Sequence, residues 1–423
     1  MSKTTEKVRL TLKRRYRAEK RFRAYGIASI AVGLMAVVVL FTDIISKGIP
    51  GFTETYIQLE VYYDTEALEI TDVRDEEQLQ FANFSKVVKV ALRERFPEVQ
   101  GRGETLDLYK LVSDGASYEL RDRLREQPTL IGKTETLWLL ANDDVDVYNK
   151  ADVEKRATSS RLTGQQQGWV DSLAAAGDLD IRFNASLFSH GDSREPELAG
   201  LWGAVVGSFF TMLVTLALSF PIGVAAAIYL EEFAPKNAFT DFIEVNINNL
   251  AAVPSIIFGL LGLAVFIGFF GMLRSLPLVG GIVLALMTLP TIIISARAAI
   301  KAVPPSIREA ALGLGASKMQ VVLHHVLPLA MPGMLTGAII GMAQALGETA
   351  PLLMIGMVAF IVDIPSGPVS PATVLPVQIY LWADSPEASF VALTSAAIMV
   401  LLTFLILMNT FAVILRKRLE RRW

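Results

Sequence analysis

Long stretches without charged residues constrain this chain more than any other feature of its sequence. A segment of about 20 apolar residues is long enough to cross the roughly 30 Å of hydrocarbon in a bilayer. Because lipid offers no hydrogen-bond partners to the backbone, such segments are expected to be helices. Six stretches have this character, and Glu348 is the one charged residue inside them: 24–42, 201–230, 247–273, 275–296, 335–361 and 388–415. The sequence therefore predicts a polytopic membrane protein with six transmembrane helices.

The composition supports this class and excludes several kinds of site. Hydrophobic residues make up 52% of the chain and charged residues only 19%, against about 25% charged residues in an ordinary soluble domain. The absence of cysteine excludes disulfides and thiolate metal sites, and three histidines make a histidine-rich metal centre unexpected. We therefore expect no metal site, no catalytic residues and no nucleic-acid partner.

The N-terminus is read as an anchor and not as a secretory signal peptide. Residues 1–23 form a strongly basic tail, and the uncharged run 24–42 follows it. That run is long for the apolar part of a signal peptide, and no small-x-small cleavage site comes after it. We expect an uncleaved first span, with the basic tail held in the cytoplasm by the positive-inside rule.

Residues 43–198 are charged and contain no stretch that could span a membrane. Alternating apolar residues predict strands near 56–63, 136–140 and 179–183, and the helical pattern covers 76–96 and 106–125. We expect a soluble α+β domain on the periplasmic side. Gly132-Lys133-Thr134 matches the last three residues of a phosphate-binding loop motif. Gln127 stands where that motif needs its first glycine, so a surface turn is expected.

Counting spans gives the predicted topology of the transmembrane domain, residues 200–415. The second span returns to the cytoplasm at Glu231, and the fourth re-enters at Arg297. The loop 301–334 is then cytoplasmic, and the sixth span ends at the basic tail 416–423. Both termini of this multi-pass protein of the cytoplasmic (inner) membrane are thus placed in the cytoplasm, in agreement with the positive-inside rule.

The loop 301–334 carries a short amphipathic pattern. Ser306 and Glu309 have the spacing of a capping box, and Gly313 and Gly315 are expected to end the helix and permit a turn. The small residues Ala310 and Ala311 would let another protein pack closely. We interpret this loop as a docking surface for an ATPase.

Specific residues in the loop resemble a known motif. Glu309-Ala310-Ala311, Gly315 and Leu327-Pro328 resemble the EAA loop of bacterial ABC importer permeases. The resemblance implies the type I ABC importer permease fold, in which this loop and the neighbouring Arg308 couple to a groove of a cytoplasmic ATPase. His325 departs from the isoleucine that is usual in the motif, which we expect to affect packing and not the role.

A second group of segments narrows the resemblance to the phosphate importer permeases of the PstA family. Residues 347–353, Gly-Glu-Thr-Ala-Pro-Leu-Leu, resemble a PstA signature, and 229–237 and 252–260 are also similar to that family. The domain 43–198 is similar to the extension of a longer PstA subgroup.

The PstA resemblance implies a transport subunit and its partners. It implies a transmembrane permease that forms half of the path for inorganic phosphate, without an ATPase motif or cofactor of its own. ATP would be bound and hydrolysed by an ATP-binding cassette dimer. The other implied partners are a homologous PstC-type permease subunit, a periplasmic phosphate-binding protein and the lipid bilayer.

The expected translocation path centres on Glu348, in the middle of the stretch 335–361. A charge at that depth is costly, so it should face the bundle interior, either in the path or in a structural hydrogen bond. Gln344 lies four residues earlier, on the same face of a helix; the family often has Arg there. Thr349 and Pro351 follow, and Pro351 is expected to kink the helix. Arg297 is either a cation of the path or an interfacial anchor.

Two other functions stay open from the sequence. A permease for another oxyanion, such as sulfate or molybdate, would share the EAA loop but would not be expected to carry the 347–353 signature. A membrane sensor would use the 43–198 domain to read a ligand, although the sequence shows no kinase, cyclase or DNA-binding module.

Overall fold

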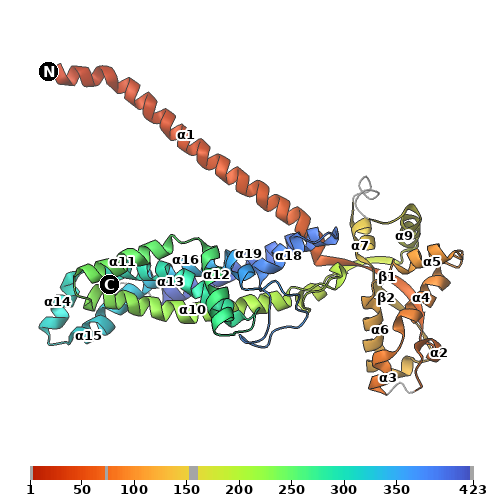
Figure 1. The fold of residues 1–423 in the computed structure, drawn as a ribbon. Helices are drawn as coiled ribbons and strands as arrows, with labels where there is room; N and C mark the ends of the chain where they lie inside the picture. Colours follow the sequence, from red (N-terminus) through yellow and green to blue (C-terminus); the bar gives the residue numbers. More distant parts are fainter. Residues whose placement is uncertain (1–2, 72–74, 152–160, 420–423) are drawn as a thin grey trace.

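The computed structural model describes residues 3–71, 75–151 and 161–419, with the backbone alone for 3–11, 13 and 419. The chain forms three parts (Figure 1). A long helix, α1 (Lys3–Gly48), leads into a head domain, defined here as residues 53–198, and a bundle of helices follows. The head domain lies at one end of the elongated bundle, and α1 leaves from the junction between them.

The head domain is built on a three-stranded antiparallel sheet with the order β2-β1-β3. Its strands are β1 (Thr53–Tyr62), β2 (Thr134–Leu140) and β3 (Leu179–Phe183), which confirms the three predicted strands. Ile57, Leu59 and Val61 alternate along β1 and are buried in the core of the domain, as expected for a strand with one face against helices.

The helices of the head domain are short and pack around this sheet. Asn83 separates the two halves of the helix predicted over 76–96, because its side chain accepts a hydrogen bond from the Lys86 N–H and caps a new helix. Gly132 has φ +72 in a turn before β2, so the predicted surface turn is confirmed. The helices are α2 (Thr65–Leu68), α3 (Glu76–Phe81), α4 (Phe84–Arg95), α5 (Arg102–Tyr109), α6 (Gly115–Glu126), α7 (Asp143–Lys150) and α9 (Gly164–Ala176), with the short helices η1 (Ile49–Phe52), η2 (Pro128–Leu130), η3 (Ser186–Phe188) and η4 (Pro196–Leu198).

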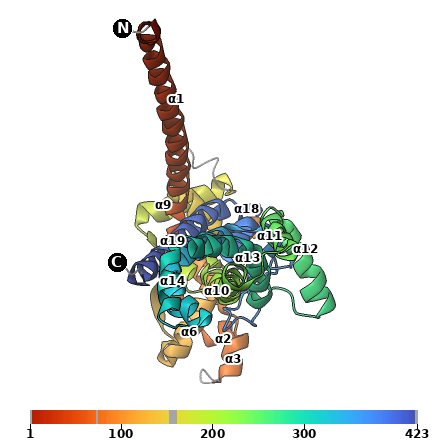
Figure 2. The same ribbon diagram turned by 90° about the vertical axis from the view of Figure 1, so that its left-hand side faces the viewer.

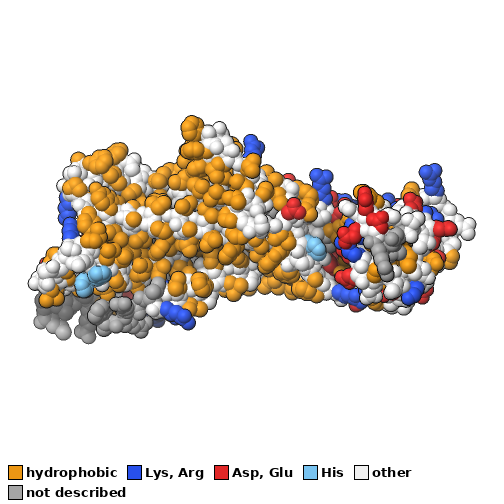
Figure 3. Space-filling model, turned by 90° about the horizontal axis from the view of Figure 1, so that it is seen from below, with side chains coloured by type: hydrophobic (Ala, Val, Ile, Leu, Met, Phe, Trp, Pro, Cys, Tyr) orange, Lys and Arg blue, Asp and Glu red, His pale blue; other side chains and the backbone are white. Residues whose placement is uncertain are grey.

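The bundle carries the apolar surface expected of a membrane domain. On the face shown in Figure 3, hydrophobic side chains cover most of the bundle surface, which we call the apolar belt, whereas acidic residues gather on the head domain. The elements are α10 (Trp202–Ile228), η5 (Tyr229–Phe233), α11 (Ala238–Ala251), α12 (Ser255–Gly262), η6 (Leu263–Phe269), α13 (Pro277–Lys301), α14 (Pro305–Gly313), α15 (Lys318–Val321), η7 (Val322–Val326), α16 (Leu327–Gly347), α17 (Ala350–Met354), α18 (Leu375–Ala383) and α19 (Ser389–Leu419).

Helix α13 is the centre of the bundle. It packs against both α10 and α16, and Figure 2 shows it among the other helices when the bundle is seen end-on. Its glycines permit the close contact with α10: a Cβ on Gly281 would lie 2.9 Å from the Thr211 carbonyl oxygen and against the side chain of Val214. The packing around α13 therefore depends on small residues, as is common between membrane helices.

The third predicted span is not a single straight helix. Among the described residues, five helices are long and apolar enough to cross a membrane, and the segments 238–251 and 255–269 make a sixth only if counted together across a 99° bend. The bend lies at Val253 and Pro254. Proline has no N–H to continue a helix and disfavours the helical conformation of the residue before it.

The fifth predicted span is displaced toward the N-terminus. The helical segment that passes through η7 and α16 runs from Lys318 to Gly347, and not over 335–361. It ends before Glu348 because Pro351 cannot donate a hydrogen bond to the Gly347 carbonyl and its ring would collide with that group.

Helix α1 stands apart from the bundle for most of its length (Figures 1 and 2). The apolar segment of α1 is not buried against any described part of the chain. Contact begins at its C-terminal end, where a Cβ on Gly48 would lie 2.8 Å from Met399 Sδ and 3.0 Å from the backbone of Ser395 in α19. Gly48 thus lets α1 cross α19 at close range.

Replacing Gly281 by valine should destabilise the bundle, because the new side chain overlaps Val214 and the Thr211 backbone. Overpacking of this kind costs about 1–3 kcal/mol, which should lower the unfolding temperature of the purified chain in detergent. Gly33→Val is the matched control, since nothing lies within 4 Å of a Cβ at Gly33. Equal unfolding temperatures for the two variants would contradict the packing described here.

Candidate functional site: helix α14 and its ion pairs

Helix α14 lies at the end of the bundle opposite the head domain (Figure 1). It begins at Pro305, with Pro304 as the N-cap residue and no side-chain capping bond. The capping box predicted from Ser306 and Glu309 is therefore wrong, because the helix starts two residues earlier and places Ser306 inside its first turn. Gly315 has φ +84, a left-handed conformation that favours glycine and turns the chain after the helix.

The two alanines of the motif face in different directions. Ala311 is buried in a cluster with Ala227, Ile300 and Val303, so it holds α14 against its own bundle. Glu309 and Ala310 are exposed. The interpretation that both alanines present a small face to a partner is therefore corrected: only Ala310 is available on the outer side.

Exposed apolar residues surround Glu309. We call this region the coupling surface and define it as Glu309, Ala310, Leu312, Leu314 and Met319. Leu314 is 90% exposed, and Leu312 and Met319 are also exposed. Several large apolar side chains beside a carboxylate, without a partner among the described residues, are typical of a protein-docking surface.

The end of the motif lies in the helical segment after the loop. His325 is exposed, and it belongs to η7, a π-helical stretch directly before α16. Leu327 and Pro328 are half-buried at the beginning of α16. The predicted residues of the loop are thus divided between the outer face of α14 and the start of the next helix.

Arg308 ties α14 to two other elements. Its guanidinium donates to Glu232 Oε1 of η5 at 2.8 and 3.0 Å. It also donates to the carbonyl oxygens of Val303 and Ile300, at 2.7 and 2.9 Å, at the end of α13. Because backbone carbonyls at a helix C-terminus lack partners inside the helix, Arg308 supplies donors to this end of α13 and fixes α14 there.

Arg297 is enclosed by carboxylates. It forms ion pairs with Glu231 of η5 and with Glu244 of α11, and Lys301 reaches Glu231 at 3.2 Å. The Arg297 side chain is largely buried. Its charge is therefore compensated inside this chain, and it is not in the extended, lipid-exposed arrangement of an interfacial anchor.

The adjacent residues Glu231 and Glu232 reach different arginines. Glu231 pairs with Arg297 in α13, and Glu232 pairs with Arg308 in α14. Both glutamates lie in the π-helical turn η5, a distortion often found at functional sites. Sequence reasoning did not identify Glu231, Glu232 and Glu244 as partners of these arginines; an acidic pair opposite an arginine at the same predicted depth was the available signal.

The segments that carry the second resemblance lie together. Helix α12 contains most of 252–260 and packs on α17, which contains the second half of 347–353. A Cβ on Gly259 would lie 2.6 Å from Pro351 Cα, so glycine is needed for this contact. Pro351 and Leu352 are buried in it. The structure thus joins two motifs that are about ninety residues apart in the sequence.

Glu348 lies at the junction between α16 and α17. It is the C-cap residue of α16, with φ −83 and ψ 114, and is half-buried, as is Thr349. The predicted shared helical face with Gln344 is wrong because Glu348 is not helical, and Gln344 is exposed. In the described part of the chain, the Glu348 carboxylate has no recorded hydrogen bond or ion pair.

Comparison with known families finds two matches, one in each half of the chain. Residues 219–423 match the model of the binding-protein-dependent transport system inner membrane component. Residues 9–159 match a domain of unknown function (DUF3333).

Individual proteins are similar over the bundle. The phosphate transport system permease protein PstA of Haemophilus influenzae is 31% identical over 225 residues, which cover 53% of this chain and 78% of that protein. The probable ABC transporter permease protein YqgI of Bacillus subtilis is 34% identical over 155 residues, 36% of this chain and 52% of that protein's length. A solved inward-facing MetNI methionine ABC transporter matches 52% of this chain and 98% of its own, with 19% identity and a TM-score of 0.42.

Replacing Glu231 and replacing Glu244, the two carboxylates around Arg297, should lower the stability of the chain by different amounts. Glu231→Gln removes a carboxylate that is 11% exposed and contacts both Arg297 and Lys301, whereas Glu244 is 34% exposed. Breaking a buried pair costs about 3–5 kcal/mol, and screening by water lowers this cost for the more exposed carboxylate of Glu244. Thermal unfolding in detergent should show a larger loss for Glu231→Gln than for Glu244→Gln, and the reverse order would contradict this geometry.

Proposed function

The chain belongs to the family of ABC-transporter permease proteins that includes PstA, and from this membership we propose that it is the permease subunit of an ATP-driven importer of inorganic phosphate. The observation that carries the substrate is the similarity to PstA proteins over the bundle, together with the 347–353 signature that packs on α12. Because the alignment covers only about half of the length of YqgI, the activity of the whole protein belongs to this proposal.

The proposed orientation has both termini and α14 in the cytoplasm. The coupling surface and the head domain lie at opposite ends of the apolar belt (Figures 1 and 3), so a bilayer around the belt separates them. Arg297, Lys301 and Arg308 lie at the α14 end, which supports a cytoplasmic position by the positive-inside rule. The head domain is then periplasmic.

The proposed partners follow from this orientation. An ATPase dimer, which supplies the bound ATP, would contact the coupling surface on the cytoplasmic side. A homologous PstC-type permease would complete the path, and a periplasmic phosphate-binding protein would deliver the anion. The chain needs no cofactor of its own in this arrangement, and its sequence contains no Walker motif.

Movement of the ATPase would reach the bundle through Arg308. This residue joins α14 to Glu232 and to the last carbonyls of α13, so a displacement of α14 displaces η5 and α13 with it. Helix α13 packs on α16, and α16 ends at Gly347, directly before Glu348. A force on α14 is therefore transmitted along packed helices to the junction between α16 and α17.

The path is proposed to pass beside Glu348 and Thr349, where the chain leaves the helix. An ionised carboxylate repels phosphate, so Glu348 would act either as a neutral hydrogen-bond donor or by holding a cation near the anion. Arg297 is compensated by Glu231 and Glu244 and therefore contributes little net positive charge. We place the main positive charge of the path on the partner permease.

Uptake of radiolabelled phosphate tests the proposal. Deleting the gene in a strain without a paralogue should abolish high-affinity phosphate uptake and leave sulfate uptake intact, and the wild-type gene should restore it. Glu348→Gln should assemble normally but impair uptake. Unchanged phosphate uptake after deletion would refute the proposed substrate, and loss of sulfate uptake instead would favour a permease for that oxyanion.

The substitution Glu309→Arg should prevent association with the ATPase, because it reverses the charge at the centre of the coupling surface. Glu309 is exposed, so membrane insertion and folding should not change. Co-purification of the ATPase in detergent measures the effect. Glu104→Arg is the matched control, an exposed charge reversal in the head domain. Retained co-purification of Glu309→Arg would remove the docking role.

A further inference from the structure

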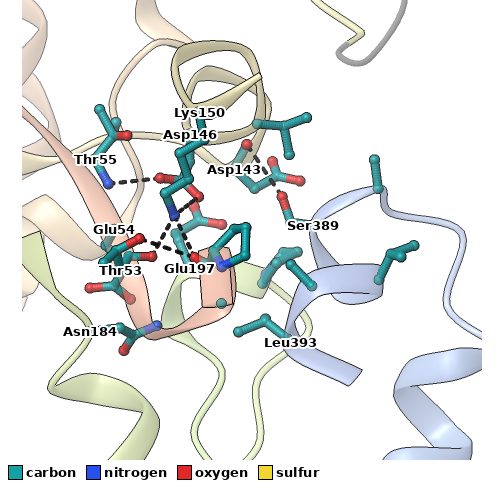
Figure 4. A pocket seen from close by; sticks show the side chains of 18 of the residues that line it. Thr53, Glu54, Thr55, Asp143, Asp146, Lys150, Asn184, Glu197, Ser389 and Leu393 are labelled. Carbon is teal, nitrogen blue, oxygen red and sulfur yellow. Dashed lines mark hydrogen bonds and ion pairs between the residues drawn. The ribbon is translucent and has the colours of Figure 1, made fainter. Parts of the chain in front are cut away.

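A cavity of about 270 Å³ lies where the head domain meets the bundle. Strand β1, helix α7 and η4 form its head-domain walls, and the first turns of α19 close it from the bundle (Figure 4). The side chains of Ser389 and Leu393 on α19 face those of Asp143 and Glu197 across this space. The cavity is thus part of the contact that seats the head domain on the bundle.

Two carboxylates in this cavity are deeply buried and incompletely bonded. Glu54 of β1 is 3% exposed and Glu197 of η4 is 7% exposed. Glu54 Oε1 and Glu197 Oε2 have no hydrogen-bond partner within the described chain. The other oxygen of Glu54 has only a long contact, 3.4 Å, from the Tyr56 hydroxyl.

The nearby cations are already engaged. Lys150 Nζ donates to Asp146 Oδ2 at 2.6 Å and to the carbonyl oxygens of Pro50 and Thr53. Lys47 pairs with Asp43 at 2.8 Å. Asp146 also accepts the Thr55 N–H at 2.8 Å, so it forms a satisfied pair with Lys150.

The remaining walls of the cavity add no compensating charge. Asp143 adds another carboxyl group, and α19 contributes Ala388, Ser389, Val391, Ala392 and Leu393 but no charged residue. A hydrogen bond with the Ser113 side chain partly offsets the rise in the pKa of Glu197. Glu54 and Glu197 therefore lack an uncommitted cation among the described residues that line the cavity.

A carboxylate buried without a cation is stabilised by taking up a proton. Burial, followed by the negative charge of Asp146, raises the pKa of Glu54 from 4.5 to about 8. Burial also raises the pKa of Glu197 to about 7 and that of Asp143 to about 6. No group of three or more acidic or histidine side chains that could hold a metal ion occurs in the part of the chain described.

We propose that this cavity is a proton-binding site that couples the seating of the head domain on α19 to the external pH, with Glu54 and Glu197 held as neutral acids in the seated state. Ionisation of either group calls for water, and the cavity can admit water by opening between α7 and α19. Two hydrogen bonds link the head domain to the start of α19: Ser389 Oγ donates to the Asp143 carbonyl at 3.3 Å, and Arg161 donates to the Pro386 carbonyl at 2.7 Å. Outside the cavity lining, Trp382 Nε1 of α18 donates to Asp192 Oδ1 at 2.9 Å.

The direction of the pH effect follows from the raised pKa values. When the head domain is unseated or unfolded, the two glutamates return toward their ordinary pKa of 4.5. The seated state then binds more protons than the open state, so its stability is fully present below about pH 4.5 and is lost as the pH rises through about 7 to 8. Seating should be firm in acid and loose in alkali.

Thermal unfolding of the purified full-length chain in detergent, from about pH 5 to about pH 9, tests the site. The unfolding temperature of the wild type should fall toward high pH, and Glu54→Gln and Glu197→Gln should each reduce this fall, because glutamine mimics the neutral acid. Glu60→Gln is the matched control, since it removes an exposed carboxylate from the same strand, β1. Parallel pH curves for wild type and Glu54→Gln would overturn the proposal.

A second measurement reports on the junction itself. The natural chain has no cysteine, so Ser389→Cys creates a single thiol on the α19 side of the cavity. At a fixed pH near 9, maleimide should label this thiol several-fold more slowly when Glu54→Gln is also present, and at an unchanged rate with Glu60→Gln. Equal rates in all three proteins would refute pH-dependent opening.

A third experiment distinguishes a bound proton from a bound ammonium ion in the cavity. Methylammonium chloride is added at high pH against sodium chloride of equal ionic strength. Stabilisation by methylammonium alone, lost in Glu54→Gln, would replace the proton by an ammonium ligand and overturn the proposal. No difference between the two salts is the expected result.

Discussion

The ion pairs that join η5, α11, α13 and α14 hold the end of the bundle together. Charged side chains from these four elements meet there at the edge of the apolar belt, where an uncompensated charge is costly. Arg297 and Arg308 each have a carboxylate partner from η5, so neither arginine is left to lipid. The position of α14, and with it the coupling surface, depends on this compensation. The rest of the bundle can then pack with small apolar residues, as seen at Gly281 and Gly259.

Periodicity and composition predicted most of the architecture. The lengths of the uncharged runs located the apolar helices, because hydrocarbon thickness sets a minimum length. Alternation in 56–63 located the central strand, since one face of the sheet had to be buried. The helix breaks were harder to place: Pro254 bends the third segment and Pro351 ends α16 early, whereas Pro221 and Pro290 lie inside continuous helices. A proline alone does not indicate which outcome the surrounding packing will favour.

The candidate site was only partly accessible to sequence reasoning. The motif at Glu309 and the turn at Gly315 were recognisable, because short-range spacing and the need for a left-handed residue are local properties. The partners of Arg297 were not, because Glu231 and Glu244 come from two other helices and their meeting depends on tertiary packing. The burial of Ala311 against its own bundle could not be predicted for the same reason. The predicted helical relation of Gln344 and Glu348 failed because it assumed a helix that continues past Gly347.

Helix α1 adds a mechanical property to this arrangement. Its apolar segment has no support from the described part of its own chain, and its contact at Gly48 is followed directly by η1 and β1. A lone spanning helix adjusts to hydrophobic mismatch by tilting, at a cost of fractions of a kcal/mol per ångström. In a bilayer of different thickness, α1 would therefore change its tilt about the Gly48 crossing, and that rotation would be delivered to the first strand of the head domain. The geometry of the junction between head domain and bundle would therefore depend on the thickness of the bilayer.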